Sequence, residues 1–466
     1  MAEFNSAQQK ALKINLDARR YGTFAEIGAG QEVVRWFFHA GKAAGTVAKS
    51  ISAYDMAVSD GLYGQAQRYV SRQRLEAMLD HEFQSLVDRL DAARGEHTSF
   101  FVFADTSATN THARRHAGHS WLGVRFQTAP RAAPSEIVIH VEMLDPFTVA
   151  QQEALGLAGV NLIYGAFYYL DDPVHLIGSL MEDLDRRSIE VDMIKFSGPA
   201  FAAVDNRLMS LQLVEQGLTD AVMFTADGEV VQPAEVLYNK PVLIERGSFR
   251  PVTNVTLDML DGAIRQYPQN ATTAQDLVVL MEMTMNNLLT GRGVDHQDFL
   301  ARVDILAALG KMVMISNYTR FGRVTGYLRQ YTKNWIGMVM GVPTLREVYE
   351  EKYYSDLEGG ILEGLGRIFQ GQVKLLIYPT RETETGALVT GEELAVPAGH
   401  QHLYKYLVEN GFIECVREFK PEGLHVTPGQ VLAAIQSGDA AWEELVPPAA
   451  AAVIKQKSLF GYRANS

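Results

Sequence analysis

Charged side chains inside apolar runs are the first candidates for chemistry in this sequence. Lys195 lies in MIKFSG and Glu282 lies in VLMEMT, two runs that otherwise have the composition of buried strands. Burying a lysine is costly unless it is paired, and burial lowers its pKa toward the range of a general base or a Schiff-base nucleophile. We therefore predict Lys195 and Glu282 as acid/base residues that could be partners. The alternative is that each lies just beyond a sheet, solvated or in a salt bridge.

Other polar residues at the ends of expected strands could bind an anion. Arg246 and Arg250 bracket the turn GSF, and two arginines beside a glycine turn could clamp a carboxylate or a phosphate. Ser197 in KFSG and Asn317 in MISN have similar positions, where α/β proteins form their sites. These four residues are candidate ligand-binding residues. The two arginines could equally pair with acidic neighbours.

The stretch TFAEIGAGQEVVRWFF, residues 23–38, predicts a strand, a glycine turn and a helix in that order. Gly28 and Gly30 would let a phosphate approach the amides of the helix N-terminus. Asp55 follows at roughly the spacing of the acid that binds a ribose hydroxyl in dinucleotide or S-adenosylmethionine sites. The third glycine of the motif G-x-G-x-x-G is replaced by Val33. The alternative is a tight turn that only packs the domain.

The histidines and the cysteine do not predict a metal site. His112, His116 and His119 cluster in HARRHAGH, but the arginines between them disfavour a cation, so surface histidines are the simplest interpretation. The single cysteine, Cys415, excludes an internal disulfide and a cysteine-based zinc site. The sequence identifies no cofactor.

Several long stretches resemble a family of uncharacterised bacterial cytosolic proteins of similar length. The resemblance spans essentially the whole chain, and the stretches that carry it are GTFAEIGAGQEVVRWFF, AKSISAYDM, QQEALGLAGVNLIYGAFY, DNRLMSLQLVEQGLTDAVMF, GSFRPVT and EKYYSDLEGGILEGLGRIF. Members of the family carry one of two automatic labels, TonB-dependent receptor or nicotinate-nucleotide adenylyltransferase. The resemblance implies a bacterial cytosolic protein and leaves its function open.

Neither label agrees with the residues. A TonB-dependent receptor is an outer-membrane protein of about 22 strands, whereas this sequence starts without an apolar signal core and places helix patterns between its strands. An adenylyltransferase needs a glycine turn directly after a strand and then the motif HxGH. His116 to His119 match HxGH, but DTSATNTHAR precedes them without such a turn, and ISNYTR (315–320) only loosely matches the second signature.

Apolar runs of strand length alternate with amphipathic stretches, which predicts an α/β fold with a mostly parallel sheet and flanking helices. The clearest helix is 72–95, and the βαβα pattern of 311–354 is the best sign of parallel strands. The expected strands are 100–105, 135–144, 159–170, 191–198, 219–225, 241–247, 276–284, 311–317, 336–342 and 373–379.

Breaks in this pattern predict four regions. They are a mixed α/β N-terminal region (1–130), a middle α/β region (131–270), the βαβα region (271–380), and a linker with a small helical C-terminal tail (381–466).

Composition limits the partners. The chain has 466 residues and a formal net charge of -13, with both signs mixed along the sequence. This balance argues against nucleic acid or an anionic membrane surface as the main partner. No apolar run approaches the roughly 20 residues of a membrane-spanning helix. We expect a cytoplasmic protein that binds a small anionic ligand, and tyrosine-rich segments suggest a homo-oligomer.

Three functions remain open from the sequence. The leading hypothesis is a protein that binds, and acts enzymatically on, a small phosphorylated or nucleotide-like ligand at strand carboxyl ends. The second is a non-catalytic self-assembling or scaffolding protein. The third is a Rossmann-like methyltransferase or dinucleotide enzyme, which would require Gly28 and Asp55 to meet in one cleft.

Overall fold

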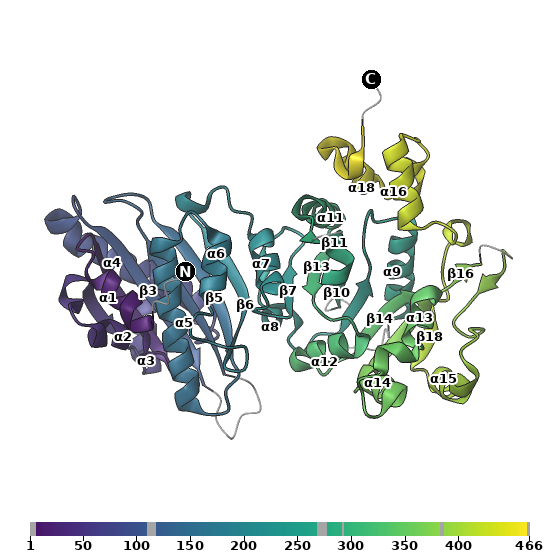
Figure 1. The fold of residues 1–466 in the computed structure, drawn as a ribbon, viewed down its shortest axis with the longest axis horizontal. Coiled ribbons are helices and arrows are strands. Elements are labelled where there is room, and N and C mark those ends of the chain that lie inside the picture. The colour runs from purple at the N-terminus through teal and green to yellow at the C-terminus, as the bar shows by residue number, and fades with distance from the viewer. Residues whose placement is uncertain (1–5, 110–117, 268–276, 291–292, 383–385, 464–466) are drawn as a thin grey trace. The chain divides into compact units, whose positions relative to one another are not determined.

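The computed structural model describes residues 6–109, 118–267, 277–290, 293–382 and 386–463. The chain forms two compact units, Met1–Asp220 and Ala221–Ser466, each with its own sheet and helices (Figure 1). This division differs from the four regions expected from the sequence. Residue 130 falls between two paired strands of one sheet, and residues 268–276 lie outside the described residues.

Unit 1 is built on a six-stranded mixed sheet of order β2-β1-β3-β4-β5-β6. The first three strands in this order are parallel, and β4, β5 and β6 continue the sheet as antiparallel neighbours. The mixed character predicted for the N-terminal region is therefore present. The strands are β1 (Arg20–Gly28), β2 (Val47–Ile51), β3 (Ser99–Ala108), β4 (Gly118–Phe126), β5 (Ser135–Met143) and β6 (Ile189–Ser197).

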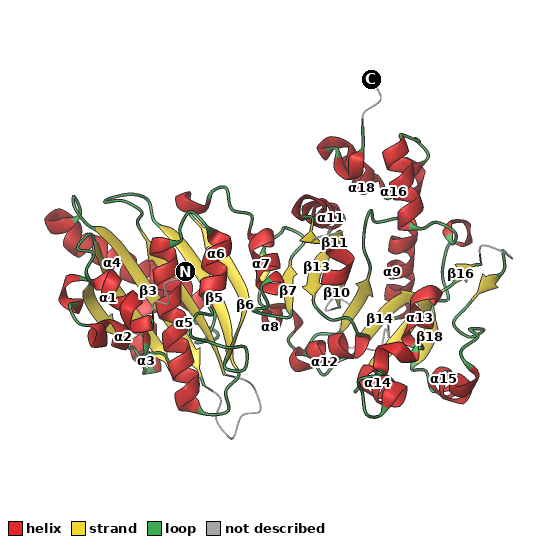
Figure 2. Cartoon of the chain, in the orientation of Figure 1, coloured by secondary structure: helices red, strands yellow, loops and turns green. Residues whose placement is uncertain are grey.

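Helices cover both faces of this sheet (Figure 2). Helix α4 contacts β3 and β4, whereas α5 contacts β4, β5 and β6 together with α1 and α2. The expected strand 159–170 is wrong, because these residues belong to α5. That helix is apolar on nearly all sides and buried along most of its length, so a continuous apolar run did not distinguish it from a strand. The helices are α1 (Ala7–Asn15), α2 (Val33–Ala40), α3 (Met56–Tyr63), α4 (Arg72–Arg94), α5 (Thr148–Tyr168), α6 (Pro173–Ser179) and α7 (Asn206–Glu215).

Unit 2 is built on an eight-stranded sheet of order β18-β15-β14-β9-β10-β13-β7-β8. Six strands are parallel, and β7 and β8 form an antiparallel edge. After the β7–β8 edge, the chain forms β9, adds β10 and β13 on one side of it, and then returns to add β14, β15 and β18 on the other. This doubly wound order places a crevice at the strand carboxyl ends beside β9. The strands are β7 (Ala221–Phe224), β8 (Val230–Val231), β9 (Val242–Arg246), β10 (Val278–Thr284), β13 (Met312–Ser316), β14 (Ile336–Gly341), β15 (Val373–Tyr378) and β18 (Ile413–Cys415).

The remaining elements of unit 2 cover this sheet and form the helical tail. Two short antiparallel pairs, β11 (Leu289–Thr290) with β12 (Gly293–Val294) and β16 (Thr380–Arg381) with β17 (Leu388–Val389), lie outside the main sheet. In the tail, α18 packs on α11. The helices are α8 (Pro233–Leu237), α9 (Asn254–Gln266), α10 (Met285–Leu288), α11 (His296–Ala308), α12 (Phe321–Tyr331), α13 (Val342–Val348), α14 (Gly360–Ile368), α15 (Gln401–Glu409), α16 (Pro428–Ser437), α17 (Trp442–Leu445) and α18 (Pro448–Lys457).

The α/β fold class predicted from the sequence is confirmed, with flanking helices, a mixed N-terminal region and a small helical C-terminal tail. Within the described part of the chain, no helix combines the length and the apolar character needed to cross a membrane.

Candidate functional site

A cavity of about 650 Å³ lies at the carboxyl edge of the parallel sheet of unit 2. Its walls come from the segments that follow β9, β10, β13 and β14, and from α14. This is the edge where doubly wound sheets bind their ligands. The cavity is therefore the best candidate site among the described residues.

Positive side chains dominate the lining of this cavity. Five cationic residues face one carboxylate, that of Glu347, and the five are Arg246, Arg320, Arg323, Lys352 and Arg367. Four of the five form ion pairs, Arg246 with the buried Glu282 and the others, Arg320, Lys352 and Arg367, with Asp356, Glu350 and Glu363. The last three pairs are solvent-exposed and hold their cations weakly. Among the lining residues themselves, an anion would meet five cations and one carboxylate.

Arg246 is held rigidly at the end of β9. Its guanidinium donates from Nε to Oε2 of Glu282 (2.9 Å) and from Nη2 to Oε1 of the same carboxylate (2.8 Å). Ser316 donates to Oε1 of Glu282 (2.6 Å), so neighbouring strands β9, β10 and β13 contribute one residue each. Arg246 also lies over the ring of Phe321, 4.4 Å from its centroid. Glu282 is fully buried and positions an arginine of the cavity.

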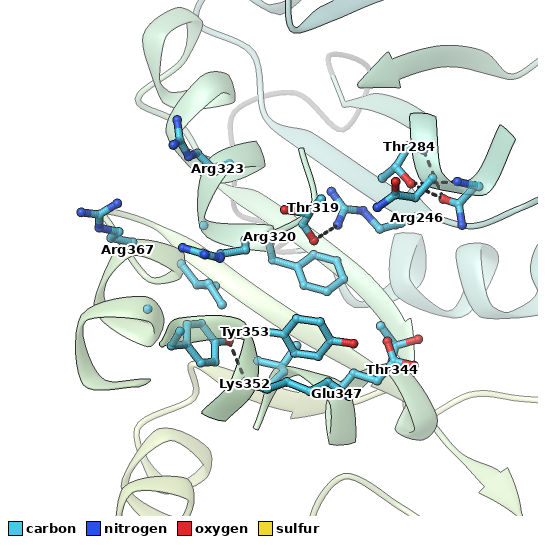
Figure 3. A pocket seen from close by; sticks show the side chains of 18 of the residues that line it. Arg246, Thr284, Thr319, Arg320, Arg323, Thr344, Glu347, Lys352, Tyr353 and Arg367 are labelled. Atoms are coloured by element: carbon cyan, nitrogen blue, oxygen red, sulfur yellow. Dashed lines mark hydrogen bonds between the residues drawn. The ribbon is translucent and has the colours of Figure 1, made fainter. Parts of the chain in front are cut away.

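The start of α12 also lines the cavity. Phe321, Gly322 and Arg323 form the first turn of this helix, and no side chain caps it. The amide of Arg323 already donates to the carbonyl oxygen of Arg320 (3.1 Å), so the helix offers an anion the amides of Phe321 and Gly322 and the positive end of its dipole. Arg323 forms no ion pair among the residues that the structure describes. In Figure 3, Arg320, Arg323 and Arg367 lie on one side of the cavity, Arg246 and Thr284 on the other, and the ring of Tyr353 between them.

A buried arginine fastens two segments of the cavity wall. Arg302 of α11 donates from Nη1 to the carbonyl oxygens of Ser248 (3.1 Å) and Asn287 (2.7 Å), and both of these residues line the cavity. Its Nε donates to Asp298 (2.7 Å), and Arg250 donates to the other oxygen of that carboxylate (2.6 Å). The turns after β9 and β10 are thereby tied to α11.

The strand-end residues predicted from the sequence have different positions. Arg246 lines the cavity, whereas Arg250 is bound to Asp298, so both arginines have acidic partners. Asn317 is exposed directly after β13 and is not among the lining residues. The structure therefore brings Arg246 and Glu282 together, but as an ion pair.

Lys195 and Ser197 belong to unit 1, in β6. This strand is the edge of its sheet, so Lys195 does not lie in the centre of a sheet. Lys195 is half-buried. Glu282 belongs to unit 2 and already has Arg246 as its cation, so a lysine partner is not needed to account for its burial.

The glycine turn at the end of β1 packs closely on β3. A Cβ on Gly28 would lie 2.1 Å from the carbonyl oxygen of Ser107, and one on Gly30 would lie 2.1 Å from Oδ1 of Asp105. The amides of Val33 and Val34, at the start of α2, already donate to the carboxylate of Glu26 (2.9 and 3.2 Å). This helix N-terminus therefore holds a carboxylate of the protein, and the contacts favour the packing interpretation of the turn over a phosphate cradle.

Asp55 and His119 are also in unit 1. The carboxylate of Asp55 caps α3 by accepting from the amides of Ala57 and Val58, and neither Asp55 nor Gly28 lines the cavity of unit 2. His112 and His116 lie outside the described residues. His119 contacts Nε2 of His140 through its Nδ1 (3.1 Å), and burial lowers the pKa of His119 to about 4. A surface position is therefore wrong for His119.

Sequence reasoning missed most of the cavity. Arg320 and Arg323 follow the expected strand 311–317 by a few residues. Asn317 is a predicted site residue because sites form at strand ends, and the same reasoning could have found these two arginines. Lys352, Tyr353 and Arg367 come from the segment after β14, and no pattern in the sequence marks them.

Comparisons with known proteins do not assign the chain to a family. No family model and no curated protein matches it. Among solved structures, the competence/damage-inducible protein CihA from Agrobacterium tumefaciens is 16% identical, with 37% of this chain and 100% of that chain covered and a TM-score of 0.25. The nicotinic acid mononucleotide adenylyltransferase of Plasmodium falciparum is 9% identical (49% and 100% covered, TM-score 0.31). A putative nicotinate-nucleotide adenylyltransferase of Vibrio parahaemolyticus is 11% identical (48% and 97% covered, TM-score 0.22). The TonB-dependent receptor label is not supported.

Proposed function

We propose that unit 2 binds a small phosphorylated, nucleotide-like ligand in the cavity at the carboxyl edge of its sheet. The observation that carries this proposal is the excess of cationic side chains around a cavity of about 650 Å³, which includes the uncapped start of α12. Arginine forks and helix amides are the groups that bind phosphate in proteins. The exposed ring of Tyr353 offers a surface on which a base could stack.

The same cavity weighs against a purely scaffolding role. That alternative required an apolar surface without a converging polar pocket, whereas polar and charged groups from several segments converge here. The dinucleotide or methyltransferase alternative depended on Gly28 and Asp55, and the packing of that turn does not favour it. Chemistry on the bound ligand stays a prediction, as does a homo-oligomeric state. Neither Lys195, which belongs to unit 1, nor Glu282, which pairs with Arg246, lines this cavity.

Isothermal titration calorimetry of the full chain tests the proposal. Inorganic pyrophosphate and ATP should bind, and adenosine should bind much more weakly. Added salt should weaken the binding of both anions. Arg323→Gln should lower the affinity about tenfold, because a charge-assisted hydrogen bond contributes about 1.5 kcal/mol.

Arg265→Gln is the matched control, because Arg265 is a half-exposed arginine of α9 outside the cavity lining. It should leave the affinity unchanged. Equal binding of adenosine and ATP, or an Arg323→Gln protein that binds as tightly as the wild type, would overturn the proposal.

A further inference from the structure

A second cavity, of about 370 Å³, lies in unit 1 between α2 and the end of β2. Its lining includes the carboxyl group of Glu26, the side chains of Gln31 and His39, and the hydroxyls of Ser50 and Ser52. Glu26 is 2% exposed, so it lies at the buried end of the cavity. Nothing proposed for unit 2 involves these residues.

A second carboxyl group, which does not line the cavity, neighbours Glu26. Glu26 of β1 is the direct cross-strand partner of Asp105 of β3. Asp105 is fully buried. The amide of Ile27 lowers the pKa of its carboxyl group, but neither oxygen has a hydrogen-bond partner of ordinary geometry among the described residues. Oδ1 lies against Gly30, in the turn that follows β1.

Neighbouring carboxyl groups in a buried place cannot both ionise without a large cost, so they retain a proton between them. Burial raises the pKa of Asp105 well above its usual range, and the charge of Glu26 adds to this rise. Burial also raises the pKa of Glu26 to about 7, against the two α2 amides that lower it, and Glu32 adds to the rise. The other charged or titratable side chains at this cavity are Arg35, which pairs with Glu32, and His39.

The turn beside the carboxyl pair is held in a rare backbone conformation. Gln31 has a φ of 141°, which side-chain-bearing residues seldom adopt, and its Nε2 donates to the hydroxyl of Ser52 (2.9 Å). This bond ties the turn after β1 to the end of β2 across the cavity. Two of the polar residues that line the cavity are therefore hydrogen-bonded to each other.

We propose that this cavity binds a small molecule that presents a primary ammonium group to Glu26. An anion is disfavoured, because Glu26 lines the buried end and the carboxyl group of Asp105 neighbours it. A protonated amine would donate to Glu26 and to the acceptor oxygens of Ser50 and Ser52, and its charge would favour the ionised form of Glu26. Binding therefore releases the proton that the carboxyl pair holds.

The experiment compares two probes of similar shape, benzylamine and benzyl alcohol, by calorimetry on the full chain. Benzylamine should bind at least about tenfold more tightly than the alcohol, as expected when a charge-assisted hydrogen bond is available. Titrations near pH 7 in buffers of different ionisation enthalpy should show proton release. The amine's affinity should rise between about pH 6 and about pH 8, as Glu26 loses its proton.

Variants locate the effect. Glu26→Gln should remove the preference for the amine, whereas Glu32→Gln, a change at the more exposed carboxylate of α2, should keep it. If Glu26→Gln does not fold, Asp105→Asn provides a second test. It removes one of the two groups that share the proton, so the amine should bind more tightly at about pH 6 and release less proton. Equal binding of the two probes, no binding of either, or an affinity independent of pH would overturn the proposal.

Discussion

Glu282 accepts three hydrogen bonds, two from Arg246 and one from Ser316, and none of them could be read from the sequence. The strand-end argument located Glu282 and Arg246 correctly at the carboxyl edge of a sheet. It did not give the order of the strands. Because β9 and β10 are neighbours in the sheet, Arg246 lies opposite Glu282 and becomes the cation that pairs with it. A buried carboxylate is a candidate acid or base only when no arginine satisfies it.

Glu282→Gln should destabilise unit 2 by about 3 kcal/mol, because removing one partner of a buried ion pair leaves the other charge uncompensated. Arg246 would lose the carboxylate that positions it, so pyrophosphate binding should weaken as well. Urea unfolding and calorimetry measure the two effects. Glu363→Gln removes the acidic partner of Arg367 in an exposed pair and serves as the control with little change in stability. A Glu282→Gln protein as stable as the wild type would contradict this role.

Asp105 predicts a pH dependence of stability in unit 1. Its pKa is raised in the folded state, so above its ordinary value of 3.8 the folded protein keeps a proton that the unfolded chain has lost. Stability must then fall as pH rises through this range, by up to about 1.4 kcal/mol per pH unit for one proton. Asp105→Asn should remove this contribution, so the variant gains stability over the wild type as pH rises from about 5 to about 8.

Pulse proteolysis in urea, followed through peptides of unit 1, measures how the stabilities of the wild type and of Asp105→Asn change with pH. Burial still raises the pKa of Glu26 in the variant, so Glu26 contributes its own fall in stability with rising pH and the slope should shrink without vanishing. An unchanged slope would show that Asp105 is ionised in the folded protein.

At the scale of elements, the turn at the end of β1 explains why glycine stands there. Gly28 and Gly41 have nearly the same positive φ, 81° and 82°, but a Cβ on Gly28 would meet the carbonyl oxygen of Ser107 while one on Gly41 would meet nothing within 4 Å. Gly41 has a φ of 82° and a ψ of 168°, a region that essentially only glycine adopts, so Gly41→Ala should cost the backbone strain alone, about 2 kcal/mol. Gly28→Ala should cost clearly more, about 3 kcal/mol, because β3 cannot move away. Thermal unfolding of the pair tests this, and equal losses would show that the backbone conformation alone requires the glycine.

Most elements could be predicted from periodicity, and the exceptions share a physical cause. Strands 100–105, 191–198 and 311–317 and helix 72–95 appear in the structure close to their expected bounds. Helix α5 was missed because it is buried on nearly all sides and so shows no polar face. Which strands are neighbours depends on contacts between distant residues, and it is this order that brings the walls of the unit 2 cavity together.

At the scale of the whole molecule, the two units have separate cores and separate candidate sites. Every residue that lines the larger cavity lies between Arg246 and Ile368, inside unit 2, and every residue that lines the smaller cavity lies inside unit 1. A polypeptide of residues 221–466 should therefore fold and bind pyrophosphate with the affinity of the full chain, within about twofold. Calorimetry on both proteins, with circular dichroism to establish folding, measures this. A folded unit 2 that has lost binding would contradict a site built from the strand ends of unit 2 alone.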